Sequence, residues 1–447
     1  MNEAISMSLA EHPKGGLLQK IGIALLTLSL IFFILISING LSVAGVVALL
    51  LTFGIGSLGG IIYSIPLFRE KAGIKNNHIM FDRMTARGIP AFAFGIFLTG
   101  FYVLLYWFPY TLSSMIKAID PVSRYLRNES ADHWFLYGAM YTVAILVMGI
   151  RFIAKYRHSR YQVIRTISVM FFQLGFAFLI PAFLKLLNQP EFYFSYFWPL
   201  KYNYLFPDDI AGLISKGGIG IFMVFWGAVL TFIATPILTY KYGKRWYCSW
   251  VCGCGGLAET MGDPYRQLSN KSVKAWKVER ITIYSVLVFI TVTTALLWLN
   301  SAYNGEVLGG ISGVFSQWYG FFIGSIFAGV IGTGFYPIFG GRVWCRFGCP
   351  MAAVLGIIQR FKSRFRITTN GGQCISCGNC STYCEMGIDV RWYAQRGQNI
   401  VRASCVGCGV CSSVCPRGVL NLENLDTKDR INDNPIILGN KGIEVKL

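Results

Sequence analysis

The sequence predicts an all-α polytopic membrane protein with a small α+β domain near its C-terminal end. Of the 447 residues, 54% are hydrophobic and only 14% are charged, whereas a soluble protein carries about 25% charged residues. The apolar residues are gathered in long stretches. All 13 cysteines lie after residue 247. These observations indicate a large membrane body followed by a compact cysteine-rich domain.

Eight apolar stretches are long enough to span a bilayer, which requires about 20 mostly apolar residues. They run over 19–38, 41–67, 89–110, 134–150, 163–187, 217–240, 281–299 and 311–339. The first two meet at Asn39-Gly40, a dipeptide typical of tight turns, so we expect a helical hairpin there. No small-residue cleavage site follows the first stretch, which indicates an uncleaved anchor.

Positive charge alternates between the connecting segments. If the N-terminus lies inside, only a few of the 40 Lys and Arg residues fall in the outer segments. These are Lys117, Arg124, Arg127, Lys185, Lys201 and Lys216. Because inside loops carry the excess of Lys and Arg, the pattern predicts that both termini face the cytoplasm and that the protein lies in the inner (cytoplasmic) membrane. Topology and the anionic headgroups of the lipid bilayer explain the net charge of +19 without a nucleic-acid partner.

Two cysteine runs with the same spacing, C-x2-C-x2-C-x3-C, lie between residues 374 and 415. In bacterial ferredoxins this spacing supplies three ligands to one [4Fe–4S] cluster and a fourth to the other. The first cluster is therefore expected on Cys374, Cys377, Cys380 and Cys415, and the second on Cys405, Cys408, Cys411 and Cys384. The reducing cytoplasm favours metal binding over disulfides. The small domain is thus predicted to be a two-cluster ferredoxin domain on the cytoplasmic side.

A second set of cysteines forms an internal repeat of two C-x3-C motifs, each placed where a span leaves the membrane on the inside. The set comprises Cys248, Cys252, Cys345 and Cys349. In a helix this spacing puts both thiols on one face, so the pairs could converge into a four-thiolate centre holding a third [4Fe–4S] cluster, Zn or Cu(I). The alternative is four independent reduced cysteines. Cys254 either substitutes as a ligand or packs as a small hydrophobe.

The chain divides into five regions on this interpretation. Residues 1–18 form a tail and 19–341 the membrane domain, including the motif at 248–252. Residues 342–370 hold the C-x3-C-P motif and a basic helix expected on the inner leaflet. Residues 371–420 form the two-cluster domain, and 421–447 show no periodicity, which predicts a loose tail.

We call the two C-x3-C motifs the exit motifs, and their four cysteines the exit cysteines. Roughly residues 217–420, which contain these motifs, the spans between them and the ferredoxin domain, resemble the NosR/NapH/CcoG-type membrane iron–sulfur proteins. The resemblance implies electron transfer between cytoplasmic donors or the quinone pool and a respiratory partner protein. Its CcoG-like members suggest an alternative, a copper-handling assembly factor for a respiratory oxidase. The chain departs from the pattern in three places. Gly253 rather than Pro follows Cys252, Glu385 replaces the Pro after Cys384, and residues 1–200 supply helices instead of an outside flavin-binding domain.

Several functional classes find no support in the residues. None of His12, His78, His133 and His158 lies near the middle of a span, so a haem held between helices is not expected. No ionisable residue lies deep in a predicted span, which disfavours pumping. No dinucleotide or P-loop glycine motif is present, so no catalytic residue is assigned and an electron-transfer component is expected. The aromatic segment 191–207 is predicted to be an interfacial belt, or else a docking face for an outside partner or a quinone.

Overall fold

The computed structural model describes residues 16–38, 41, 43, 45–74, 85–303 and 305–427, and the strands at 437–439 and 442–444. Within these residues, eight helices are long and apolar enough to cross a membrane, as predicted. They are α1 (Leu17–Ser37), the helix containing α2 and α3 (Gly45–Phe68), α5 (Ile89–Trp107), α7 (His133–Tyr156), α8 to α9 (Arg160–Leu186), α11 to α12 (Gly218–Tyr242), α15 (Val273–Ala302) and α16 with its continuation (Ile311–Ile331). The turn predicted at Asn39-Gly40 lies outside the described residues.

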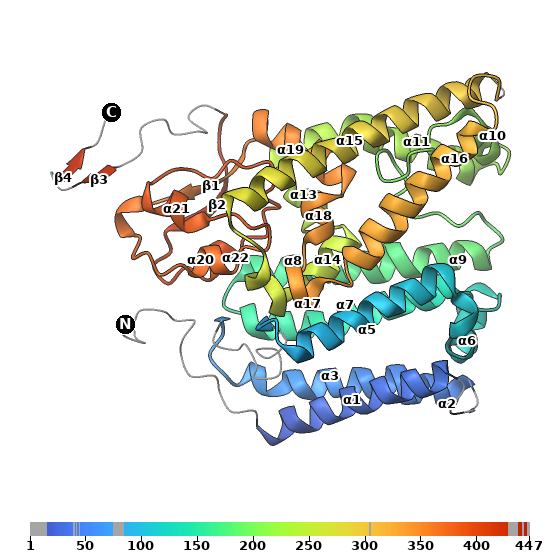
Figure 1. The fold of residues 1–447 in the computed structure, drawn as a ribbon, viewed down its shortest axis with the longest axis horizontal. Helices are drawn as coiled ribbons and strands as arrows, with labels where there is room; N and C mark the ends of the chain where they lie inside the picture. Colours follow the sequence, from blue (N-terminus) through green and yellow to red (C-terminus); the bar gives the residue numbers. More distant parts are fainter. Residues whose placement is uncertain are drawn as a thin grey trace.

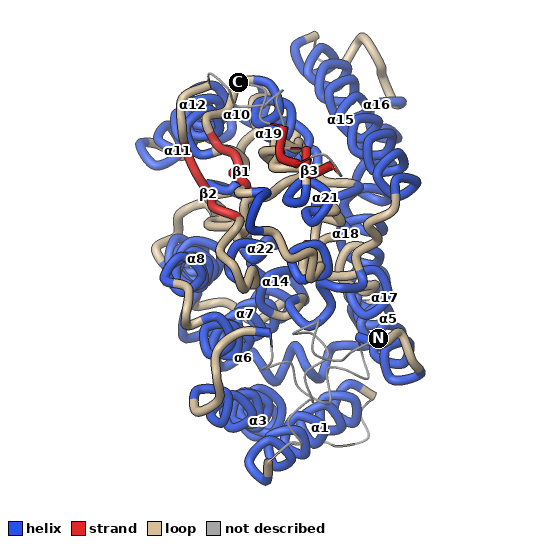
Figure 2. The backbone as a smooth tube through the Cα atoms, turned by 90° about the vertical axis from the view of Figure 1, so that its left-hand side faces the viewer, coloured by secondary structure: helices blue, strands red, loops and turns tan. Residues whose placement is uncertain are grey.

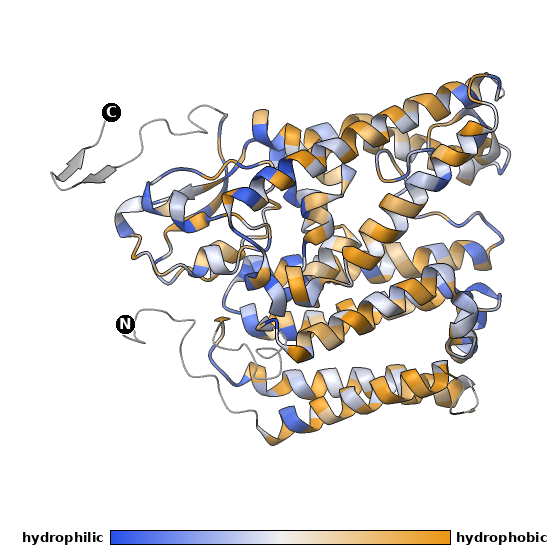
Figure 3. Cartoon of the chain, in the orientation of Figure 1, coloured by the Kyte–Doolittle hydropathy of each residue, from blue (hydrophilic) through white to orange (hydrophobic). Residues whose placement is uncertain are grey.

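The long helices run side by side, and the small C-terminal domain sits at one end of their bundle (Figure 1). Short helices α6 (Ser113–Arg127) and α10 (Pro207–Ile214) lie at the other end. Apolar residues dominate the long helices, and hydrophilic residues gather in the small domain and at the helix ends beside it (Figure 3). Seen from that end, α1 and α3 form an edge of the bundle far from the strands (Figure 2).

Local sequence explains where several long helices begin and bend. The Asp132 side chain accepts a hydrogen bond from the Phe135 backbone N–H and caps α7, and Ser272 caps α15 through the Ala275 N–H. Four spans contain π-helical stretches that join shorter α-helices. These stretches are Leu50–Gly54 between α2 (Gly45–Leu49) and α3 (Ile55–Ser64), Phe172–Leu179 between α8 (Arg160–Phe171) and α9 (Ile180–Leu186), Leu230–Ala234 between α11 (Gly218–Val229) and α12 (Thr235–Tyr242), and Gly320–Ile331 after α16 (Ile311–Tyr319).

The aromatic segment between α9 and α10 packs into the bundle. The sequence predicted instead an interfacial belt or a docking face. Phe197 and Tyr204 are fully buried. The Phe197 ring lies 5.7 Å, centre to centre, from that of Tyr247, next to the first exit cysteine. The Trp198 indole N–H donates to Thr294 Oγ1 of α15 at 3.2 Å. This segment therefore fills the interior between the membrane helices of the second half of the chain.

The small domain is built on a two-stranded antiparallel sheet of β1 (Phe365–Thr369) and β2 (Leu420–Asn424), with Ile367 opposite Leu422. A single bridge pairs Ile367 with Ile400. Short helices α20 (Asn379–Thr382), α21 (Val390–Gln395) and α22 (Val410–Ser413) complete it. Residues 421–424 thus belong to a strand, and β3 (Ile437–Gly439) pairs with β4 (Gly442–Glu444), so the prediction of a loose tail over 421–447 is wrong for these parts.

The basic surface helix expected within 342–370 is also wrong in its placement. Helix α19 (Pro350–Phe361) is largely buried between the membrane helices and the small domain. Its Gln359 amide donates to the carbonyl oxygens of Arg402 (2.8 Å) and Cys405 (2.7 Å). The chain then turns into β1, where Arg366 is buried. Contacts with the small domain therefore cover part of this helix.

Candidate iron–sulfur centres

The two cysteine runs of the small domain fold in the same way. The third cysteine of each run lies in a short helix, Cys380 in α20 and Cys411 in α22. Matched positions adopt left-handed backbone conformations, with φ of 57° and 63° at Ser376 and Gly407, 83° and 74° at Gly378 and Gly409, and 65° and 62° at Gly387 and Gly418. Such turns aim successive backbone N–H groups toward one point, which favours an anionic group there. The sequence repeat is therefore a structural repeat.

Each predicted ligand set lines its own cavity. One small cavity is lined by Cys374, Cys377, Cys380 and Cys415. The other is lined by Cys384, Cys405, Cys408 and Cys411. The fourth cysteine of each run therefore crosses to the cavity of the other run, as the ferredoxin spacing predicts.

The thiols crowd one another in both cavities. Burial raises the pKa of Cys380 to about 12, and Cys377, Cys415 and Cys374 add to the effect. Burial likewise raises the pKa of Cys411, with Cys408, Cys405, Cys384 and Cys380 adding to it. Clustered thiols of this kind become stable thiolates when a metal binds, so the residues fit an iron–sulfur cluster in each cavity. Helices α20 and α22, which carry Cys380 and Cys411, pack against each other, so the two cavities are neighbours.

The two exit motifs share one backbone design. After α12, Gly243 adopts φ 68° and leads to α13 (Arg245–Cys248) and α14 (Gly253–Thr260). After α17 (Tyr336–Phe339), Gly340 adopts φ 93° and leads to α18 (Val343–Phe347) and α19. The second cysteine of each motif, Cys252 or Cys349, precedes the following helix as its N-cap residue, and its N–H donates to the carbonyl five residues earlier. The motif is thus a break between two helices and not the single helical turn that was predicted.

The four exit cysteines are brought together. Cys248, Cys345 and Cys349 are buried in one core cluster, and Cys252 packs against it. Burial raises the pKa of Cys349, and Cys345, Cys248 and Cys252 raise it further. Cys254 is exposed, which does not fit the prediction of a packed small hydrophobe. The four exit cysteines thus lie in or against one core cluster, which also contains module cysteines.

We call the small domain the module, and the cavity lined by Cys384, Cys405, Cys408 and Cys411 the second module cavity. A buried network of charged side chains, which the sequence did not predict, joins the exit motifs to this cavity. Glu385, which lines that cavity, accepts from Arg342 Nε at 2.9 Å and pairs with Arg266 at 2.8 Å. Arg342 also donates to Cys345 Sγ at 3.6 Å and to the Cys248 carbonyl at 3.2 Å. All three charged side chains are at most 1% exposed. One arginine thus contacts both an exit cysteine and the carboxylate beside the module cavity.

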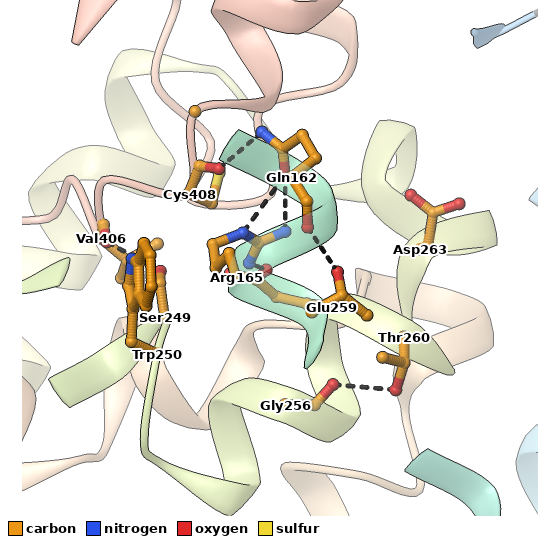
Figure 4. Close-up of polar contacts among 12 residues, drawn as sticks. Gln162, Arg165, Ser249, Trp250, Gly256, Glu259, Thr260, Asp263, Val406 and Cys408 are labelled. Carbon is orange, nitrogen blue, oxygen red and sulfur yellow. Dashed lines mark hydrogen bonds and ion pairs between the residues drawn. The ribbon is translucent and has the colours of Figure 1, made fainter. Parts of the chain in front are cut away.

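The network continues into the membrane helices (Figure 4). Glu259 of α14 pairs with Arg342. It also pairs with Arg165 of α8, which lies close to it in Figure 4. The carboxylate oxygens of Glu259 and Glu385 and the Cys408 Sγ all lie within 4.8 Å of one another. Three arginines surround these two carboxylates, so we interpret the group as part of the ion network and not as a separate metal site.

Asp263 extends the network on the far side of Arg266. It accepts from Arg266 and Lys155 at 2.8 Å each and from Arg151 at 3.2 Å. Arg151 and Lys155 lie in the last turns of α7, which runs past the predicted end of its span. The one sequence signal for this network was the Glu385 found where a proline is usual, together with basic residues just beyond the predicted spans.

The comparisons with known proteins agree with these sites. A family model described as a 4Fe-4S dicluster domain matches residues 373–420. A second, described as a 4Fe-4S binding domain, matches 210–274 and 319–368, so each matched segment contains one exit motif. Two models of ferredoxin-type 4Fe-4S domains thus match the chain, which supports iron–sulfur clusters at these sites. Its NosR/NapH/CcoG-type resemblance stays a prediction.

A curated relative extends the agreement. YccM of Escherichia coli (strain K12), whose name gives it a provisional role as an electron transport protein, is 29% identical over 170 residues. The match covers 36% of this chain and 47% of YccM, so the chain spans about half the length of this relative. No solved structure matches the chain.

Proposed function

We propose that the protein is an electron-transfer protein of the cytoplasmic membrane, in which electrons pass between two module clusters and a third centre at the exit cysteines. The observation that carries the proposal is the direct connection between these sites. Arg342 contacts Cys345 Sγ and Glu385, and Glu385 lines the second module cavity. Because electron tunnelling falls steeply with distance, buried sites joined by such contacts favour transfer between them.

The way the module is docked supports a proposed order of the centres. Side chains from the membrane domain hold three successive carbonyl groups of the second run. Ser249 Oγ donates to Val406 O at 2.8 Å, the Tyr161 hydroxyl to Gly407 O at 2.9 Å, and Gln162 Nε2 to Cys408 O at 2.9 Å. The first cavity instead has the exposed side chain of Ile375 in its wall. We therefore place the first cluster as the contact point for a soluble partner and the second as the link to the exit centre.

The reaction proposed for the chain is one-electron transfer with no catalytic side chain. The exit centre is proposed to be a third [4Fe–4S] cluster, since the matching family model over both exit segments is described by 4Fe-4S binding. A quinone or a respiratory partner protein exchanges electrons with it at the inner surface. The copper-handling alternative has no observation of its own in its favour, and copper bound at the exit cysteines would revive it.

Freeze-quench EPR tests the proposed order of transfer. Oxidised protein is mixed without oxygen with a reduced viologen dye, which donates single electrons, and the reduction of each centre is followed. Cys374→Ser, which removes a ligand of the first cluster, should slow reduction of the other centres several-fold. Ser376→Gly, in the same loop, keeps the left-handed backbone and should leave the rates unchanged. Equal rates in the Cys374→Ser variant and the wild type would contradict the order.

A further inference from the structure

A large crevice lies where the membrane domain meets the module. Its volume is about 810 Å³, within the range of small-molecule sites. The first turns of α15 form one wall and α19 another, and module residues between 386 and 404 close it. We call this space the basic crevice, because Lys244, Arg280, Arg346, Arg360 and Arg402 line it against a single acidic residue of its wall, Glu279.

The charge of the basic crevice is not balanced from within. Glu279 is engaged by Arg346 Nε at 2.7 Å. Lys244 Nζ donates to the Ala403 carbonyl at 3.0 Å, and Arg402 Nη1 to the Tyr393 hydroxyl at 3.1 Å, both neutral acceptors. An anion bound in the crevice would find several cationic donors already in place.

Arg346 adds a buried cationic side chain to the wall of the crevice. The residue is 4% exposed, yet its Nη2 atom has no hydrogen-bond partner among the described residues. Its other two nitrogens are held by Glu279 and by the Asn270 carbonyl at 2.7 Å. Buried guanidinium nitrogens are normally satisfied, and an exception calls for a ligand or water.

The surroundings of the crevice indicate which anion it takes. Trp276 lies in the first turns of the membrane helix α15. Arg402 of the module and Arg280 of α15 both lie over its ring, at 4.3 and 5.2 Å from the ring centre. Further along α15, Ile281, Val288 and Val292 expose 67%, 62% and 48% of their surface. A basic, aromatic site at the end of a span that continues into an exposed apolar surface suits a lipid with an anionic headgroup.

We propose that the basic crevice binds the phosphate group of an anionic phospholipid, whose acyl chains lie along the exposed apolar side of α15. The headgroup contacts α15, α19 and module residues together and so fastens the module to the membrane domain. The crevice wall includes Cys345 and Met386, and Met386 also lines the second module cavity. This inference does not depend on electron transfer by the chain.

Native mass spectrometry of delipidated full-length protein in neutral detergent tests the proposal. Titration with phosphatidylglycerol should show one tightly held lipid per chain, and phosphatidylcholine should bind more weakly. Removing two cationic contacts with Arg280→Gln/Arg402→Gln should weaken phosphatidylglycerol binding about tenfold or more. The matched control Lys274→Gln/Lys277→Gln removes the same charge from exposed positions of α15 outside the crevice and should bind as the wild type does.

Several outcomes would overturn the proposal. These are equal binding of the two lipids, undiminished binding by the crevice variant, or inorganic phosphate alone displacing phosphatidylglycerol at the same concentration. Visible cluster absorbance shows that each variant is folded. If the double variant loses this absorbance, Arg280→Gln alone carries the test, since its side chain is exposed and holds no module residue in the described contacts. A wild-type affinity in that single variant would equally reject the site.

Discussion

The module cysteines and the exit cysteines are both repeated pairs, but different forces hold them together. In the module, each cavity is formed by loops within 42 residues of sequence, and left-handed turns at matched positions aim the backbone at the cluster. At the exits, Cys248 of α13 and Cys345 of α18 are far apart in sequence and lie in one core cluster. The first site is encoded locally, and the second depends on the whole fold.

Buried ion pairs connect the exit site to the rest of the fold. Arg342 and Glu385 tie the exits to the module with both side chains at most 1% exposed. A buried ion pair contributes modest stability, because desolvation offsets much of the attraction, but removing one partner is strongly destabilising. The exit site is thus expected to be sensitive to substitutions that never touch a cysteine, whereas the module should be sensitive mainly to its own loops.

The largest effect should come from a cluster ligand. Cys408→Ser is expected to bleach one module cluster, with the loss of about four iron atoms per chain, and to abolish electron transfer. Cys349→Ser should leave both module clusters in place, since Cys349 lines neither cavity. Iron analysis and EPR of the reduced variants check this. Full activity in Cys408→Ser would refute the ligand assignment.

Glu385→Gln should be the next most severe change. It removes one of the two buried carboxylates that each of Arg342 and Arg266 contacts, and breaking a buried pair costs about 3–5 kcal/mol. Thermal unfolding, followed by the loss of cluster absorbance, measures it. The control is Asp120→Asn, which breaks the exposed Arg124 pair and should cost about 0.5 kcal/mol or less. Similar melting temperatures for the two variants would show that the network does not hold the module.

A pair of glycine substitutions tests the local encoding of the module. Gly378→Ala should cost about 1–2 kcal/mol from the left-handed backbone alone, since its Cβ would meet nothing closer than Arg391 Nη1 at 3.8 Å. Gly409→Ala should cost more, because its Cβ would lie 2.9 Å from Tyr161 Cε1 of the membrane domain. Chemical denaturation of the two variants compares them, and equal losses would argue against tight docking of the second run.

The smallest expected effect is the change in melting temperature when the pH is lowered from neutral, which acts through the buried ion network. Burial favours a raised pKa for Asp263, but Lys155, Arg266 and Arg151 outweigh it and hold the pKa well below its ordinary value. A lowered folded-state pKa gives stability that is present above the unfolded pKa of about 3.9 and is lost as the pH falls toward the folded pKa. Melting temperature should therefore change little between pH 7 and 5 through this group, and fall below about pH 4. In Asp263→Asn that acid-induced fall should be shallower.

Sequence reasoning succeeded where short-range chemistry decides the structure. Twenty-residue apolar stretches predicted the spans, and cysteine spacing predicted which four cysteines line each module cavity. It failed where tertiary contacts decide. Nothing local shows that α19 is covered by the module, that Phe197 reaches Tyr247, or that Arg165 of one span pairs with Glu259 after another. The C-x3-C repeat was visible, but its break between helices follows from Gly243 and Gly340 at the membrane exits.

Iron and acid-labile sulfide counts on protein purified without oxygen test the central claim most directly, which is that the exit cysteines form a third cluster coupled to the module. About twelve iron and twelve sulfide per chain, falling to about eight in Cys345→Ser/Cys349→Ser, is the predicted result at four per cube. About eight in both proteins would contradict it, and the exit cysteines would then be left to another metal or to a structural role.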